Sequence, residues 1–364
     1  MVLDLLIFMK MMKLLWLASE RPAIQTVFDV SYSDIKEVPR GNALVIKKNG
    51  KTSIKEILKP KINKSCSFEG SSLHSGEYSR ITLHPAPANT GIKFKRVDSK
   101  LPANQIIIDA SYKNIKSSQL CTTIENDYGL SVSTIEHLMA ALHACGIDNL
   151  LIDINSSEMP ILDGSAIEYT SMISKLGLKQ LNSKKKYVKI LKTIQVKREN
   201  AYINIYPSDE LSVDYTINYP DTIVGKQNIS IDTVNKNTFN NSLAECRTFT
   251  FETELELLRS NGIIKGGSLS NAVVFGKEEA LNQDGLRTIN EPVKHKALDA
   301  IGDLFLAGNC VLGHIEAYCA GHSLMHEALN EIFSDQNNWE IITLSEHADF
   351  SPHQEQLSVG TANI

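Results

Sequence analysis

The chain has 364 residues, of which 42% are apolar and 22% are charged, and its formal net charge is −5. These values are close to the average for soluble globular proteins, so they exclude a disordered chain, a collagen-like fibre and a coiled coil. The mild acidity argues against a general nucleic-acid binder, because such a protein gains affinity by neutralising phosphates. The six cysteines are sparse and form no C-x-x-C pair, which favours reduced thiols in a cytoplasm over a disulfide scaffold. At about 150 residues per domain, the length predicts two domains plus an extension.

The most apolar stretch is the N-terminal segment 1–18, MVLDLLIFMKMMKLLWLA. Three charged residues interrupt it, which makes it too short and too charged for a membrane-spanning helix of about 20 residues. Its positive charges fall inside the apolar run, whereas a secretory signal peptide carries them before it. Three interpretations stay open: a start codon assigned too early, a membrane-surface or targeting helix, and an ordered part of the fold. We assign residues 1–61 to an N-terminal extension, whose lysine-rich second part is typical of a solvated linker or a small strand–turn appendage.

The segment 62–185 is predicted to form a first α+β domain. Alternating apolar residues predict strands at 79–83 and 91–96, which a turn-rich stretch separates. In 133–145, apolar residues recur at positions i, i+3, i+4 and i+7, which predicts one face of a helix. A buried strand is expected at 149–154.

The basic stretch 184–186 is interpreted as an exposed linker, which places the domain boundary there. A second α+β domain is expected over 186–350, followed by a polar tail at 351–364. Each half then has strands, a helix and a further strand in the same order. The predicted fold class is therefore α+β, with two similar sheet-plus-helix layers packed together. The elements expected in the second half are strands at 188–196, 201–206 and 211–217, a helix at 292–307 that starts with proline, and a strand at 311–318.

The helix predicted at 292–307 carries the first candidate chemistry. His295, Asp299 and Asp303 fall within a sector of about 80°, and Gly302 in the same sector would leave room there. A histidine and an aspartate four residues apart can present an imidazole and a carboxylate to one metal ion. The alternative is an ordinary solvated helix face, which this spacing alone favours.

Three further places could contribute to a site. Glu136 and His137 could supply a general base and a metal ligand, although Ser133 and Glu136 also match a capping box, which the pattern alone favours. His322, in a loop beside a glycine, is a plausible acid or base, although a lone histidine usually has no such role. Thr248 places a hydroxyl beside a ring that is expected to be buried, and its alternative is an ordinary strand residue.

Taken together, these residues match a catalytic zinc site. Two histidines and one aspartate leave a fourth position open, which is typical of a catalytic site rather than a structural one. A neighbouring glutamate that is not needed as a ligand suits a base that activates water. No cysteine cluster competes for the metal.

Ten segments, taken in order, resemble the zinc-dependent UDP-3-O-acyl-N-acetylglucosamine deacetylases of lipid A biosynthesis. The resemblance runs from about residue 62 to about residue 345, and TIEHLMAAL and HKALDAIGDL are its most specific parts. The segments are LHSG (73–76), LHPAPANTGIKFKR (83–96), STIEHLMAAL (133–142), GIDN (146–149), EMPILDGSA (158–166), RTF (247–249), GGSLSNAVV (266–274), NQDGLR (282–287), HKALDAIGDL (295–304) and GH (321–322).

The resemblance implies a role for each matching residue. It implies that His322, as a cation, balances oxyanion charge and protonates the leaving amine, while Asp303 orients it. It implies an oxyanion contact for Thr248 and a position near the substrate for Lys296. The implied zinc ligands are His137, His295 and Asp299, and the implied general base is Glu136.

The family fold also implies two α+β halves with the active site between them and an insert in each half. The second insert, at about 250–275 here, is expected to form an apolar passage for the fatty acyl chain, with Phe249 at its mouth and space left by Gly267. The other residues expected to contact the substrate are Leu73, Leu120, Leu255, Ala272 and Val274.

The sequence departs from the family pattern at places that do not touch the metal. Ser72 stands where a second glycine is usual, and Cys319 stands where a lysine usually meets the diphosphate. An asparagine pair is common where this chain has Met325 and His326, and Pro292 lies in a stretch that is usually acidic. Cys319 weakens the expected diphosphate contact, which bears on turnover and headgroup preference.

The resemblance implies a zinc-dependent hydrolase that removes acetate from UDP-3-O-acyl-N-acetylglucosamine in the committed step of lipid A biosynthesis. We expect a cytoplasmic monomer with at most peripheral contact to the inner membrane, and organellar import through residues 1–20 is an alternative. Two rival functions stay open: a non-catalytic relative that binds a nucleotide-sugar or lipid, and a zinc hydrolase of another amide. Apolar walls at 250–275 would argue against the second rival.

Overall fold

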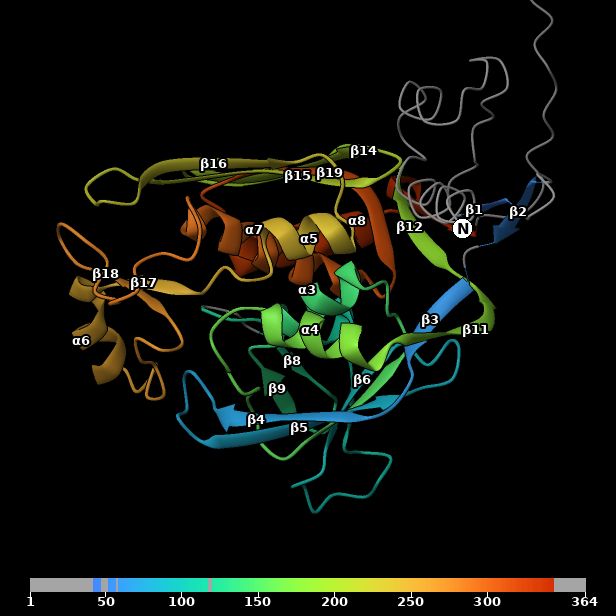
Figure 1. The fold of residues 1–364 in the computed structure, drawn as a ribbon, viewed down its shortest axis with the longest axis horizontal. Helices are drawn as coiled ribbons and strands as arrows, with labels where there is room; N and C mark the ends of the chain where they lie inside the picture. Colours follow the sequence, from blue (N-terminus) through green and yellow to red (C-terminus); the bar gives the residue numbers. More distant parts are fainter. Residues whose placement is uncertain (1–41, 47–51, 57, 117–119, 344–364) are drawn as a thin grey trace, which may run out of the picture. The chain divides into compact units, whose positions relative to one another are not determined.

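The computed structural model describes four stretches of the chain, residues 42–46, 52–56, 58–116 and 120–343 (Figure 1). The predictions for the apolar segment 1–18 and the tail 351–364 fall outside these residues. Within the described stretches, no helix has the length and apolar character that crossing a membrane requires.

The chain divides into two units. The smaller unit lies within residues 1–57 and 343–364, and the larger unit spans Leu58–Ile342. In the smaller unit, β1 (Asn42–Ile46) pairs antiparallel with β2 (Thr52–Glu56). All candidate site residues belong to the larger unit.

The first part of the larger unit is built on a five-stranded sheet. Its strand order is β4-β5-β10-β6-β7, in which β10 is antiparallel to β5 and parallel to β6. Alternate residues such as Ile81 and Leu83 are fully buried, as expected for a sheet with one face on the core. The strands predicted at 79–83, 91–96 and 149–154 are confirmed. The strand bounds are β4 (Cys66–Ser71), β5 (Tyr78–Pro85), β6 (Ile92–Arg96), β7 (Ile107–Asp109) and β10 (Leu150–Ile154).

Two helices and two strand pairs accompany this sheet. The helix predicted over 133–145 is α3, which is shorter at both ends (Glu136–Ala144) and is followed by Gly146 at φ +71°. Residues 58–61, assigned above to the extension, belong to β3, which pairs with β11. The remaining bounds are β3 (Leu58–Ile62), β8 (Thr123–Glu125), β9 (Ser131–Ser133), α4 (Ile167–Leu176) and β11 (Leu178–Lys184).

The second part of the larger unit is built on a seven-stranded sheet. Strand β19 lies at its centre, antiparallel to β14 and parallel to β12 and β15. The strands predicted at 201–206, 211–217 and 311–318 are confirmed. The bounds are β12 (Lys186–Ile190), β13 (Ile194–Arg198), β14 (Ala201–Pro207), β15 (Leu211–Tyr219), β16 (Gly225–Ile231), β19 (Cys310–Tyr318) and β20 (Trp339–Thr343).

Helices and a small parallel strand pair complete the second part. The helix predicted at 292–307 is α7 with a final 3-10 turn, and Pro292 lies in its first turn, where a missing N–H costs nothing. The bounds are α5 (Lys236–Ser242), β17 (Phe249–Phe251), α6 (Glu252–Ser260), β18 (Val273–Phe275), α7 (Glu291–Leu304) and α8 (His322–Ser334).

One prediction about the middle of the chain holds in part and another is wrong. Lys184 and Lys186 are exposed, as expected for the stretch 184–186, but Lys185 between them is only 9% exposed and its Nζ donates to the Gly146 carbonyl at 3.2 Å. The stretch 188–196 is not one strand, since β12 ends at Ile190 and β13 begins at Ile194. The partner of Lys185 lies 39 residues away, so the sequence around this lysine does not indicate that it is buried.

Helices α3, α4, α5, α7 and α8 lie between the two sheets, whereas α6 lies beside β17 and β18 (Figure 1). Helix α3 contacts α7, and both contribute to a continuous core that includes Leu138 and Leu298. The separation of sheets and helices confirms the α+β class. The likeness of the two halves to each other stays a prediction.

Candidate active site

Backbone contact between α3 and α7 brings the candidate residues together. A Cβ on Gly302 would lie 2.1 Å from the Glu136 carbonyl oxygen and 2.9 Å from its carbon, so glycine is required at this crossing. The predicted face of α7 points into this contact, and His295, Asp299 and Asp303 are 1%, 5% and 1% exposed. The interpretation of this face as solvated is therefore wrong.

His137, His295 and Asp299 form a compact cluster whose ligand atoms all lie within 4.8 Å of one another. Oδ1 of Asp299 is 3.3 Å from Nε2 of His295 and 3.6 Å from Nε2 of His137. Nδ1 of His295 is 2.9 Å from the Cys246 carbonyl oxygen, an acceptor, so Nδ1 carries the hydrogen. The lone pair of Nε2 therefore faces the cluster, as in histidines that bind metals.

The chemistry of these three groups fits a metal ion. Oδ1 of Asp299 is buried and has no hydrogen-bond partner among the described residues, an arrangement that costs free energy unless a ligand compensates it. Burial and the neighbouring His295 lower the pKa of His137 to about 3, so its imidazole is neutral. Burial raises the pKa of Asp299, but His295, Lys296 and His322 outweigh burial and hold it below its usual range. Two neutral imidazoles and one carboxylate are the donor set of a catalytic zinc site.

Glu136 is the first residue of α3 and faces the cluster. The helix N-cap is Ile135, and no side chain caps it, so the predicted capping box of Ser133 and Glu136 is wrong. Instead, Oε2 of Glu136 accepts a hydrogen bond from the Thr122 backbone N–H at 3.1 Å. Burial raises the pKa of Glu136 to about 8, with Asp299 also raising it and His322 opposing. A carboxylate with a pKa near neutrality suits a general base.

His322 begins α8 and lies near both Glu136 and Asp299. Its Nδ1 is 2.7 Å from Oδ2 of Asp303, while its Nε2 is 4.0 Å from Oε1 of Glu136 and 3.9 Å from Oδ2 of Asp299. Burial alone would lower the pKa of His322, but the Asp303 carboxylate and its hydrogen bond raise it to about 9. His322 is therefore a cation at neutral pH, with Nε2 directed at the site.

Lys296 lies beside the cluster, and the backbone of Thr248 is held by two neighbouring segments. Nζ of Lys296 donates to Oδ2 of Asp299 at 3.0 Å, so the lysine contacts the carboxylate of the cluster. The backbone of Thr248 is fixed from two sides, since its N–H donates to Gly164 at 2.9 Å and its carbonyl accepts from Val273 at 2.8 Å. The oxyanion role of the Thr248 hydroxyl stays a prediction.

The residues predicted to form an acyl passage have different environments. Ala272 and Val274 are buried, whereas Leu120 is 47% exposed and Leu255 is half-buried on α6. Phe249 contacts three aromatic rings, at centroid distances of 6.0 to 6.3 Å. A Cβ on Gly267 would lie 3.6 Å from Cδ1 of Leu73, so this loop of the insert reaches the LHSG segment. A passage along these residues stays a prediction.

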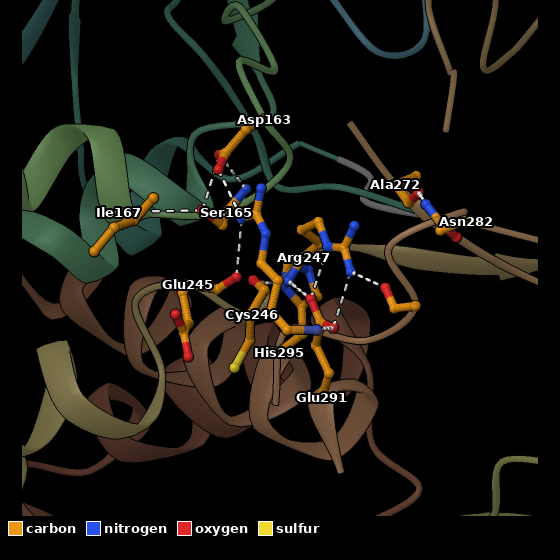
Figure 2. Close-up of polar contacts among 12 residues, drawn as sticks. Asp163, Ser165, Ile167, Glu245, Cys246, Arg247, Ala272, Asn282, Glu291 and His295 are labelled. Atoms are coloured by element: carbon orange, nitrogen blue, oxygen red, sulfur yellow. Dashed lines mark hydrogen bonds and ion pairs between the residues drawn. The ribbon is translucent and has the colours of Figure 1, made fainter. Parts of the chain in front are cut away.

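A network of ion pairs holds the segment that carries the Cys246 carbonyl (Figure 2). Glu291, at the start of α7 and fully buried, accepts from the backbone N–H and Nε of Arg247, each at 2.9 Å. Nη1 of Arg287 donates to Oδ2 of Asp163 at 2.7 Å. The network joins α7 to the 246–248 segment and thereby fixes the acceptor that orients His295.

Sequence reasoning missed several residues of this site. Thr122 contacts both Glu136 and Asp303, and nothing in the sequence around it indicates this. Glu158 accepts from the backbone N–H groups of His74 and Ser75 at 2.7 and 2.8 Å, which anchors the LHSG segment. Glu158 lies in the matched segment EMPILDGSA, which was a signal for Glu158 but not for its partners, whereas Thr122 lies outside every matched segment.

Comparison with known proteins agrees with this geometry. The family model described as LpxC: UDP-3-O-acyl N-acetylglycosamine deacetylase matches residues 59–334. A protein of Wigglesworthia glossinidia brevipalpis is 37% identical over 292 residues, covering 79% of this chain and 97% of that protein. A protein of Syntrophotalea carbinolica is 40% identical over 292 residues, covering 80% and 93%. Both are named UDP-3-O-acyl-N-acetylglucosamine deacetylase. The chain belongs to the LpxC family of UDP-3-O-acyl N-acetylglycosamine deacetylases.

Proposed function

We propose that the chain hydrolyses the 2-acetamido group of UDP-3-O-acyl-N-acetylglucosamine, giving UDP-3-O-acyl-glucosamine and acetate in the committed step of lipid A biosynthesis. The observation that carries this proposal is the convergence of His137, His295 and Asp299 beside Glu136. Membership of the family and the names of the relatives support the substrate. In the reaction the amide C–N bond breaks, water adds its oxygen to the acetyl carbon, and the amine leaves with a proton.

We propose that His137, His295 and Asp299 hold one Zn²⁺ ion. When bound, zinc would lower the pKa of a water molecule towards about 7 and polarise the amide carbonyl. The unpartnered Oδ1 of Asp299 and the neutral imidazoles support this assignment.

Glu136 is the proposed general base. The Thr122 N–H binds Oε2 of Glu136, which leaves Oε1 to accept a proton from the attacking water. Burial raises the pKa of Glu136 to about 8, so its carboxylate form has a high affinity for the proton that it takes from water.

His322 is the proposed general acid. Asp303 accepts a hydrogen bond from Nδ1 of His322 and stabilises the imidazolium. The hydrogen on Nε2 is therefore the proton available to the leaving amine. The positive charge also opposes the negative charge that develops on the acetyl oxygen, as the Thr248 hydroxyl is proposed to do. Groups of this kind each contribute about 10² to 10³ in rate.

The substrate carries a diphosphate, while the whole chain has a net charge of −5. Burial by itself lowers the pKa of Lys296, but the effect of Asp299 and Tyr219 is larger and leaves the pKa above its usual value. Lys296 therefore stays charged. We propose that Lys296 and His322 supply the local positive charge that the anionic substrate needs. We also propose that the apolar residues of the second insert, with Ala272 and Val274 as walls, bind the acyl chain.

The test measures acetate release from UDP-3-O-acyl-N-acetylglucosamine by the purified full chain loaded with zinc. Glu136→Gln should lower kcat by about 10² to 10⁴ while zinc content is unchanged. Glu331→Gln, an exposed change on α8, is the matched control and should leave kcat unchanged. Undiminished activity in Glu136→Gln, or no acetate from the zinc-loaded wild type, would refute the proposal.

The same assay separates the rival functions. A non-catalytic relative would bind the nucleotide-sugar without releasing acetate, and a hydrolase of another amide would release nothing from this substrate. We further propose a cytoplasmic monomer with at most peripheral membrane contact, which size-exclusion chromatography and vesicle sedimentation would test.

A further inference from the structure

Thr122 occupies a central position, and the proposed mechanism uses its backbone N–H but not its hydroxyl. It is fully buried between β8 and the ends of α3, α7 and α8. Its backbone N–H donates to Oε2 of Glu136 at 3.1 Å, and its hydroxyl oxygen lies 2.5 Å from Oδ1 of Asp303 and 3.1 Å from Nε2 of His326. One residue thus contacts the proposed base and the carboxylate that holds the proposed acid.

The hydrogens of this cluster can be assigned from chemistry. Other charges outweigh burial and hold the pKa of Asp303 far below its usual range, so both of its oxygens only accept. Oδ2 accepts from Nδ1 of His322 at 2.7 Å, and Oδ1 accepts the single hydrogen of the Thr122 hydroxyl. The hydroxyl oxygen can then only accept from His326, so Nε2 of His326 carries a hydrogen.

His326 therefore fixes the direction of the Thr122 hydroxyl. Its side chain is 7% exposed, and its ring lies one helical turn after His322 on α8, with the ring centroids 6.4 Å apart. A rotation of the Thr122 hydroxyl away from Asp303 would leave a carboxylate oxygen and an imidazole N–H buried with a poorer partner, which is costly.

We infer that Thr122, oriented by His326, is a positioning residue that holds Glu136 and the His322–Asp303 pair in fixed relation. The inference rests on the proposed function, since it concerns the groups assigned there as base and acid. The base and the acid must act on the same amide, so holding them at a fixed distance from each other lowers the entropic cost of reaching a reactive geometry. Thr122 touches neither the amide nor the metal cluster in this account.

The test compares two substitutions of Thr122 in the full, zinc-loaded chain. Thr122→Val keeps the shape and the backbone N–H but removes the hydroxyl, and should lower kcat by about 10- to 100-fold, the effect of losing a hydrogen bond to a charged group. KM should stay within about twofold and zinc content should be unchanged. Thr122→Ser restores the hydroxyl and should recover most of kcat.

Thr170→Val is the matched control, because Thr170 is 1% exposed and its hydroxyl donates to the Ile167 carbonyl in α4. Activity of Thr122→Val equal to that of Thr170→Val would overturn the inference. An equal loss of kcat in Thr122→Ser would also overturn it, because packing rather than the hydroxyl would then be responsible.

His326 provides a second measurement that does not depend on the folding of Thr122→Val. His326→Leu removes the N–H and should lower kcat about 3- to 10-fold, whereas His326→Gln can restore a donor and should recover part of the loss. The double variant Thr122→Val/His326→Leu should be no slower than Thr122→Val alone, because both changes remove one connected unit. Additive losses, or equal rates for Leu and Gln at 326, would refute the role of His326. Failure of the proposed function looks different, since the wild type itself would then release no acetate.

Discussion

The contact between α3 and α7 makes Gly302→Ala the sharpest single perturbation of the site. In a helix interior, Gly→Ala normally stabilises by about 1 kcal/mol, since alanine has the higher helix propensity. Here the new Cβ would lie 2.1 Å from the Glu136 carbonyl oxygen and 3.2 Å from the Ala140 backbone nitrogen. These are backbone atoms, so no side chain can move aside, and the sign of the effect should reverse.

The magnitude follows from the distances. Restoring a contact of about 3 Å requires the helices to separate by close to 1 Å, whereas metal–ligand distances tolerate only about ±0.2 Å. His137 and Asp299 lie on opposite sides of this contact, so the cluster should open. We expect a loss of about 1–3 kcal/mol in the free energy of unfolding, as for other overpacked cores, and at least a tenfold weaker zinc affinity.

Urea unfolding gives the stability, and competition with a zinc chelator gives the affinity. Gly70→Ala is the matched control, because its Cβ would meet only Pro160 Cβ at 3.9 Å, an ordinary contact. If Gly302→Ala were as stable as the wild type and bound zinc equally well, the idea that this crossing sets the site would be refuted.

Three further predictions concern the metal, a buried histidine and the ion-pair network. Removing zinc with a chelator should abolish activity and lower Tm, because Oδ1 of Asp299 then stays buried without a partner; differential scanning calorimetry with and without added zinc checks this. Burial, with a smaller effect from Lys185, lowers the pKa of His143 to about 3 in the native state. In the unfolded chain the pKa of this histidine is about 6.5. Below that pH the unfolded chain binds a proton that the native chain does not. Stability should therefore fall as pH drops from about 6.5, and His143→Phe should flatten that fall in urea unfolding at pH 7 and pH 5; an unchanged slope contradicts the assignment. Glu291→Gln leaves the buried Arg247 charge without its counter-ion and should cost about 3 kcal/mol and weaken zinc binding, while an exposed change such as Glu278→Gln should do neither.

Local sequence patterns predicted the helices that carry the site. They failed where a contact between residues far apart in the chain determines the local structure. Helices α3 and α7 follow from their apolar spacing, although the structure buries every residue of α3 and all of α7 except Lys294 and Lys296. The capping box failed because Ser133 belongs to β9, where it pairs with Thr123, and the next residue, Thr134, adopts φ +59°. The chain therefore enters α3 from a strand, and Glu136 turns inward rather than back to a cap.

The same reason explains the residues that sequence reasoning missed. The hydroxyl of Thr122 meets Asp303 across 181 positions, and the Glu291 carboxylate meets Arg247 across 44. Neither spacing has a period that a single sequence reveals. The resemblance supplied the catalytic candidates themselves, whereas their supporting partners depend on how the two parts of the chain meet.

The proposed zinc ligands come from two helices that are far apart in the chain, His137 on α3 and His295 and Asp299 on α7. During synthesis, the ribosome completes α3 long before α7 exists, so the nascent chain offers the metal at most one of its three ligands. Loading with zinc therefore reports that both parts have folded and met. In a cell short of zinc, a half-made chain would therefore not sequester the metal, because the proposed site exists only after both parts have been made.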